Sequence, residues 1–148
     1  MQWYGTDSMP LELSSLRKAV AALNAGLEKS NDPKFMTGLD ETTRNVIKSG
    51  VIQHFEFTYE LCWKFIKRWL EANISPGVAD GVTRRELFRM AAENRLIVDV
   101  EAWMRHHDAR NQTSHTYDLR IADSVHAAAR VFSLDAQKLL NALEARND

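Results

Sequence analysis

Hydrophobic residues recur three and four positions apart along most of the chain, the spacing of one face of an α-helix. This pattern predicts helices over residues 10–30, 41–72, 83–94, 98–110 and 120–144. The apolar stripe of the first comprises Leu13, Leu16, Val20, Leu23 and Leu27, and that of the last comprises Ile121, Val125, Ala128, Phe132, Ala136, Leu139 and Leu143. No alternating pattern is long enough for a β-sheet, and the sequence shows no internal repeat.

The connections between these helices are short. Pro33 and Gly38 break the pattern after the first helix, NISPGVADG follows the second, and Thr83 with Glu86 matches the capping box that starts a helix. We therefore expect an all-α fold, an antiparallel bundle of four to five helices. A length of 148 residues fits one domain spanning residues 1–148, with residues 1–9 as a mobile tail.

The second predicted helix is apolar nearly all round. Phe55, Tyr59, Cys62, Ile66 and Trp69 cover one side, and Phe57, Leu61, Trp63, Phe65 and Leu70 spread over much of the rest. Such a helix must be buried on several sides. Two interpretations are open: it is the central helix of the bundle, or its extra side forms an isologous interface in a homodimer or larger homo-oligomer.

Composition narrows the functional classes. The net charge of −1 gives no general attraction to nucleic acid or membranes, so an RNA partner needs a local basic patch. Arg84, Arg85, Arg89, Arg105 and Arg110 could supply one. The chain has one cysteine, no membrane-length apolar run and no signal-peptide pattern, from which we expect a cytoplasmic protein without a membrane partner.

Several familiar sites are absent from the sequence. It has no glycine-rich phosphate loop, and His54-Phe55-Glu56 lacks the paired cysteines of zinc deaminases. His106, His107, Asp108 and His115 suggest a metal, but adjacent helical residues point about 100° apart. We therefore expect no metal and no cofactor.

Two polar features remain. Glu56, Glu60 and Lys64 follow one another at four-residue steps, and they either pair on the surface or line a polar cleft in which Glu56 holds a cation such as an arginine. Residues 110–118, RNQTSHTYD, are either a solvated helix end or a site.

The second possibility makes chemical sense. Arg110 and His115 would lie about 140° apart on a continuous helix, so they converge only if the helix ends between them or a two-fold axis joins two copies. Arginine binds phosphate and histidine transfers protons, while Asn111 and Ser114 add hydrogen bonds and Tyr117 a modifiable hydroxyl. This set suits RNA cleavage by attack of the 2′-hydroxyl on the adjacent phosphate.

The same residues carry a resemblance. Arg110, Asn111 and His115 match the R-N-x-x-x-H motif of the HEPN superfamily, and with Tyr117 they match the R-x-x-x-x-H-x-Y form of HepT-like toxins. Together with residues 52–71 and 93–118, they make the chain similar to the nucleotidyltransferase substrate-binding family of that superfamily, over roughly residues 13–143.

The resemblance implies a homodimer whose interface cleft carries Arg110 and His115 from both chains, and a separately encoded small nucleotidyltransferase as partner. In the toxin-like branch it implies metal-independent endoribonuclease activity, which the partner silences by attaching AMP to the tyrosine matching Tyr117. His115 would be the acid/base, Arg110 the phosphate clamp and Asn111 the orienting residue, with Ser114 and Glu56 in support. A non-catalytic subunit that binds substrate or nucleotide for the nucleotidyltransferase is the alternative, and a purely structural oligomer is the third hypothesis.

Overall fold

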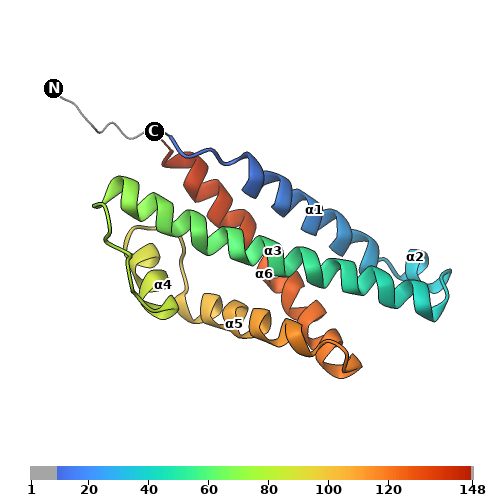
Figure 1. The fold of residues 1–148 in the computed structure, drawn as a ribbon. Helices are drawn as coiled ribbons and strands as arrows, with labels where there is room; N and C mark the ends of the chain where they lie inside the picture. Colours follow the sequence, from blue (N-terminus) through green and yellow to red (C-terminus); the bar gives the residue numbers. More distant parts are fainter. Residues whose placement is uncertain (1–9, 148) are drawn as a thin grey trace.

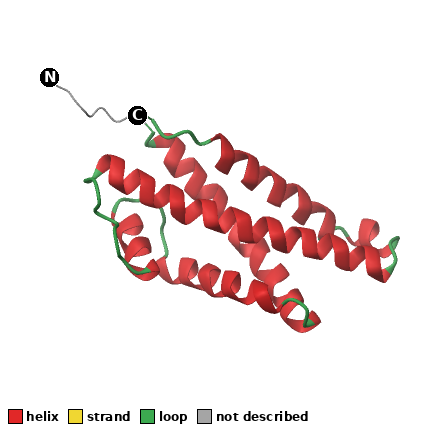
Figure 2. Cartoon of the chain, viewed as in Figure 1, coloured by secondary structure: helices red, strands yellow, loops and turns green. Residues whose placement is uncertain are grey.

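The computed structural model describes residues 10–147, which form helices joined by short connections without any strand (Figure 2). The α-helices are α1 (Ser14–Ser30), α2 (Pro33–Thr37), α3 (Glu41–Asn73), α4 (Arg84–Glu93), α5 (Val100–Asn111) and α6 (Leu119–Ala145). A 3₁₀-helix, η2 (Gln112–His115), continues directly from α5. The predicted all-α fold is therefore confirmed. The tail predicted at residues 1–9 lies outside the described residues.

The long helices α1, α3, α5 and α6 reverse direction one after another, which gives the antiparallel bundle that the short connections predicted (Figure 1). Helix α3 is central, because it contacts α1, α6, α4 and α5. The core around it is rich in aromatic rings packed edge to face: Phe55 and Phe132 have ring centroids 5.1 Å apart, and Trp103 lies 5.8 Å from Phe132. This core fixes α5 against α3, where the candidate site lies.

Side-chain caps set where the helices begin. The Thr83 hydroxyl accepts a hydrogen bond from the Glu86 backbone N–H at 3.1 Å, as the capping-box pattern predicted. The reciprocal half of the box is absent among the described hydrogen bonds, since the Glu86 carboxylate pairs instead with Arg89 at 2.7 Å. Aspartates cap four other helices in the same way: Asp32, Asp40, Asp99 and Asp118.

Residues 10–147 contain one α-helix more than the sequence predicted. The segment expected only as a break contains α2, in which the Asp32 side chain caps the first turn and Pro33 occupies the first helical position. Proline ends the preceding helix but suits the start of a new one, because the first backbone N–H of a helix has no partner within it. Five residues are too few to produce a periodic apolar signal.

The aromatic helix α3 is buried on the side that carries its main apolar stripe, from Phe55 to Trp69. Its central position accounts for much of its apolar surface. Of its other apolar residues, Phe65 and Leu70 are buried as well, whereas Phe57 is 56% exposed and Leu61 and Trp63 are half-buried. No helix within residues 10–147 has the length and apolar character required to cross a membrane.

Candidate functional site

The α-helical part of α5 ends at Asn111, inside the polar run that the sequence marked as a helix end. Three hydroxyls bond to backbone carbonyls just beyond it: Thr113 Oγ1 to Arg110 at 2.7 Å, Ser114 Oγ to Asn111 at 3.4 Å and Thr116 Oγ1 to Thr113 at 3.1 Å. Such local bonds favour helix ends, and here they accompany the tighter winding of η2.

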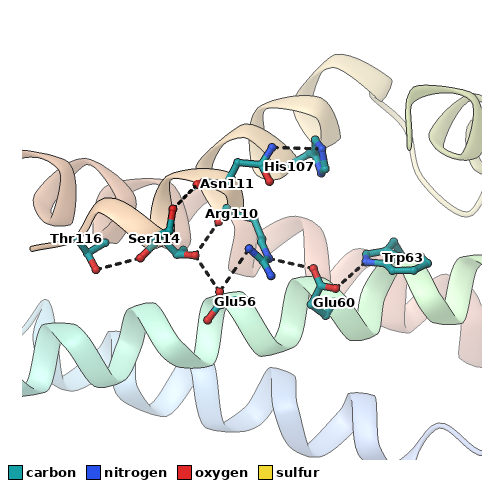
Figure 3. Close-up of polar contacts among 9 residues, drawn as sticks. Glu56, Glu60, Trp63, His107, Arg110, Asn111, Ser114 and Thr116 are labelled. Carbon is teal, nitrogen blue, oxygen red and sulfur yellow. Dashed lines mark hydrogen bonds and ion pairs between the residues drawn. The ribbon is translucent and has the colours of Figure 1, made fainter. Parts of the chain in front are cut away.

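Arg110, in the last turn of α5, points to two carboxylates of α3 (Figure 3). Its Nε donates to Glu60 Oε2 at 3.0 Å, and its Nη1 lies 3.4 Å from Glu56 Oε2. Glu56 and Glu60 are one helical turn apart, so both face the same guanidinium. Glu56 thus contacts an arginine, as one of the two interpretations expected; the polar cleft of that interpretation stays a prediction.

Both carboxylates are held from a second side as well. Thr113 Oγ1 lies 2.9 Å from Glu56 Oε2. The indole Nε1 of Trp63 donates to Glu60 Oε1 at 3.2 Å (Figure 3). Within residues 10–147, Nη2 of Arg110 has no hydrogen-bond partner, and the side chain is 32% exposed. Arg110 is thus anchored through Nε and Nη1, and it keeps donors with which to bind an anion.

A second network lies next to this arginine. His107 Nδ1 is 2.8 Å from the buried Tyr59 hydroxyl, and its Nε2 is 3.4 Å from Asn111 Nδ2. Burial, reinforced by the nearby Arg84, lowers the pKa of His107 below the ordinary value for histidine. The neutral ring can therefore accept from Asn111 at Nε2 and donate from Nδ1 to Tyr59. This connects Asn111 to the core.

Arg84, from α4, adds another cation to the cluster. Its guanidinium carbon lies 3.6 Å from the centre of the Trp63 ring, and its Nε is buried without a hydrogen-bond partner among the described residues. Trp63 therefore stacks on Arg84 with one face while its N–H bonds to Glu60.

Tyr59, His107 and Thr113 were not assigned to the site from the sequence. A signal for each was present, because Tyr59 follows Glu56 by three residues and His107 and Thr113 lie three residues either side of Arg110. Residues three apart share a helix face, so the partners of a known site residue could have been sought there.

His115 and Tyr117 make no described side-chain hydrogen bond to this cluster. His115 is exposed and Tyr117 is 84% exposed, and their ring centroids are 6.2 Å apart. No hydrogen bond joins His115 to Arg110 in the described structure. Ideal geometry for one α-helical and four 3₁₀ steps again separates the two positions by about 140° around the axis. Within one chain, the helix end therefore gives no described hydrogen bond between them.

The other histidines in this region also point in different directions. His106 faces the core, where its Nε2 lies 2.6 Å from Asp135 Oδ2, whereas its neighbour His107 faces Tyr59. Among residues 10–147, no group of three or more His, Cys, Asp or Glu side chains is arranged to hold a metal ion.

Comparison with known proteins places the chain in a defined group. Residues 11–145 match the family model described as nucleotidyltransferase substrate binding protein like. A Haemophilus influenzae protein named "Probable ribonuclease HepT" is 32% identical over 138 residues, which is 93% of this chain and 94% of that protein.

Two solved structures are similar. One, from Haemophilus influenzae, is described as revealing the fold of a substrate binding domain of a nucleotidyltransferase; it has a TM-score of 0.87 and 30% identity and covers 90% of this chain and 99% of its own. The other, from Thermus thermophilus, has a TM-score of 0.67 and 25% identity, with 86% and 98% covered.

Proposed function

The chain belongs to the family of proteins like the nucleotidyltransferase substrate-binding protein, and from this premise we propose that it is the HEPN-type partner of a small, separately encoded nucleotidyltransferase. We propose further that residues 1–148 form one domain, that it acts in the cytosol as a homodimer, and that it cleaves RNA without a metal at a cleft between the two copies. The observation that carries the proposal is the similarity over nearly the whole chain to a protein named "Probable ribonuclease HepT".

The geometry around Arg110 supports a phosphate site. The guanidinium is fixed at Nε and Nη1 by Glu60 and Glu56, which leaves Nη2 for a phosphate oxygen. Fixing a side chain before the ligand arrives removes part of the entropy cost of binding. The same two carboxylates repel a phosphate. Additional positive charge, from Arg84 or from a second copy of the chain, would offset this repulsion.

In the proposed reaction, the 2′-oxygen of a ribose attacks the adjacent phosphorus and the bond from phosphorus to the 5′-oxygen breaks. One His115 imidazole accepts the 2′-hydroxyl proton, and the His115 of the other copy gives a proton to the departing 5′-oxygen. Arg110 binds the phosphate and stabilises the charge that develops on its oxygens. Asn111, held by His107, orients the phosphate, and Ser114 supplies a further hydroxyl.

Tyr117 suits the role of regulatory acceptor. Its side chain is 84% exposed and lies beside His115, so a nucleotidyltransferase could reach the hydroxyl. AMP attached there would place a bulky phosphate next to His115 and block access to the cleft. A Tyr117→Phe variant would then stay active in the presence of the partner and ATP.

The alternative function is that of a non-catalytic subunit that binds substrate or nucleotide for the nucleotidyltransferase. The description of the structure with a TM-score of 0.87 as a substrate binding domain favours it. It requires the same Arg110 contact with phosphate, but no proton transfer by His115.

An RNA-cleavage assay in EDTA separates the two functions. We expect the purified protein to cut single-stranded RNA and the His115→Ala variant to lose at least 100-fold in rate, because removal of an acid/base residue typically costs 10²–10⁴-fold. Gln112→Ala, which changes an exposed residue of the same 3₁₀-helix, is the matched control and should keep its activity. Equal cutting by His115→Ala would refute the catalytic role, and nucleotide binding without any cutting would favour the alternative.

A further inference from the structure

Arg84 carries a positive charge that no carboxylate neutralises by an ion pair among residues 10–147. Three of the five arginines expected to form a basic patch pair with glutamates in the structure: Arg85, Arg89 and Arg110. Arg84 has no such pair, its side chain is half-buried, and its Nε is buried without a hydrogen-bond partner in the described chain. A partly buried guanidinium without a counter-charge is costly, so this position favours an anion bound from outside the chain.

Trp63 holds this guanidinium in a defined place beside the candidate site. The Arg84 guanidinium carbon lies 3.6 Å from the centre of the indole ring, and the Nε1 of the same indole donates to Glu60 at 3.2 Å. Glu60 in turn accepts from Arg110 Nε at 3.0 Å. The positions of the two guanidinium groups are therefore linked through Trp63 and Glu60 before any ligand binds.

A second cation lies at the same indole. Lys64 Nζ is 5.7 Å from the centre of the Trp63 ring, and the Lys64 side chain is exposed. It forms no ion pair with a carboxylate of the described residues, since Glu60, four residues earlier, is bound to Arg110 and Trp63 instead. Trp63 thus brings together two cations whose charge the described chain does not neutralise.

This indole lies next to the Arg110 site along α3. Trp63 follows Glu60 by three residues, which is about 4.5 Å along the helix axis, and Figure 3 shows it beyond Glu60 on the side away from Glu56. Successive phosphates of one nucleic-acid strand are separated by about 3.4 Å of helix axis. The two steps are of the same order, so a strand that follows α3 can place one phosphate at Arg110 and the next at Arg84.

We propose that Arg84 and Lys64, brought together at Trp63, form a second phosphate subsite, which binds the phosphate adjacent in the RNA to the one held by Arg110. This inference rests on the proposed function for the phosphate at Arg110. It specifies the substrate as an oligonucleotide with at least two neighbouring phosphates, whereas a mononucleotide contacts Arg110 alone. The subsite binds and positions the strand and takes no part in proton transfer.

Two probes that differ in their number of phosphates test the subsite. Adenosine 3′-monophosphate has a single phosphate group. A short 2′-O-methyl oligoadenylate has several and cannot be cut, because it lacks the attacking hydroxyl. Isothermal titration calorimetry with the full chain measures the binding of each probe, whether or not the protein cleaves RNA.

We expect Arg84→Gln to weaken binding of the oligoadenylate about tenfold or more and Lys64→Gln about threefold, because each loses a charged contact to phosphate. Neither change should alter binding of the mononucleotide by more than about twofold, whereas Arg110→Gln should weaken binding of both probes. Arg85→Gln is the matched control, since Arg85 is the next residue, is exposed and pairs with Glu101. It should leave both affinities unchanged.

Salt dependence separates a phosphate contact from a structural role. For a single strand, each phosphate contact contributes about 0.7 to the slope of log affinity against log salt concentration. Arg84→Gln and Lys64→Gln should each reduce the slope for the oligoadenylate by about this amount, and Arg84→Lys, which keeps the charge, should retain it. Because Lys64 is exposed, its substitution tests the subsite even if the Arg84 variants fold poorly.

Equal weakening of the two probes by Arg84→Gln would overturn the proposal, because Arg84 would then share the phosphate of Arg110. Oligoadenylate binding that is unchanged by Arg84→Gln and Lys64→Gln, or absent in the unchanged protein, would overturn it as well. Oligoadenylate binding with the expected losses, in a protein that cuts no unmodified RNA, would support the subsite while the ribonuclease proposal fails.

Discussion

At the scale of single residues, the Tyr59 hydroxyl is the polar group that connects the core to the candidate site. It is buried, its pKa is raised by that burial, and it lies 2.8 Å from His107, which in turn contacts Asn111. As the acceptor of the His107 Nδ1–H, this hydroxyl stays neutral across the physiological range and adds no buried charge.

We expect Tyr59→Phe to lower the free energy of unfolding by about 1–2 kcal/mol, because it leaves a nitrogen of a partly buried imidazole without a partner while the ring still packs. Urea unfolding measures the difference. Tyr117→Phe is the matched control, since its hydroxyl is exposed, and it should change stability by less than about 0.5 kcal/mol. If both substitutions lowered the free energy of unfolding equally, the Tyr59 hydroxyl would not have the proposed stabilising role.

At the scale of elements, α4 depends on a single side-chain cap. Thr83 accepts from the Glu86 N–H at the helix start, and Glu86 does not reciprocate because it pairs with Arg89. Since Arg84 follows Thr83 directly, the position of the Arg84 guanidinium on Trp63 depends on this cap too.

We expect Thr83→Ala to destabilise the protein by about 1 kcal/mol, the usual cost of losing an N-cap hydroxyl. Thr42→Ala provides the comparison, because Thr42 is exposed in the first turn of α3 without a described side-chain hydrogen bond; this change should be neutral or slightly stabilising. Thermal unfolding of both variants measures the effect, and indistinguishable midpoints would disprove the capping role.

The long helices were predictable because each places enough apolar residues on one face to give a detectable helical spacing of apolar residues in the sequence. Their ends agree with the structure to within a few residues, since caps such as Thr83 are local signals. Helix α2 was missed because a helix of five residues has no period to detect, and its start depends on Asp32 and Pro33 alone.

The candidate site was predictable only in part. Glu56 was considered as a partner for an arginine, because a carboxylate on an apolar helix needs a counter-charge. The Tyr59–His107 contact could not be foreseen, because it depends on how α3 and α5 cross, and helical spacing does not contain that information. For the same reason, the sequence did not distinguish a helix end from a two-fold axis as the means of joining Arg110 and His115.

At the scale of the whole molecule, two buried histidines and one partly buried histidine link stability to pH. Burial lowers the pKa of His106, His107 and His126; for His106 the hydrogen bond to Asp135 opposes the shift. His126 is held at 2.7 Å from Ser30 Oγ. Each group takes up a proton less readily when the chain is folded.

The unfolded chain therefore binds more protons than the folded one as the pH falls through about 6.5, the ordinary pKa of histidine. We expect the free energy of unfolding to be highest above that pH, to fall between about pH 7.5 and 5.5, and to level off below the folded-state pKa values. Urea titrations across this range measure the slope.

The variant His126→Asn provides a check on this dependence, because it removes one of the three groups. Its pH dependence should be shallower than that of the unchanged protein. A free energy of unfolding that rises as the solution is acidified from pH 7.5 to 5.5 would be incompatible with burial of neutral histidines.

The two ends of the described chain meet. The side-chain amide of Asn147 accepts from the Leu11 N–H at 2.7 Å and donates to the Leu11 carbonyl at 2.9 Å, much as the next strand of a sheet would. The two ends of the described chain are therefore adjacent, so a short linker could join them. A short glycine bridge across this point, with a new opening at the exposed turn around Gly77, would give a circular permutant with the same packing but a different order of synthesis.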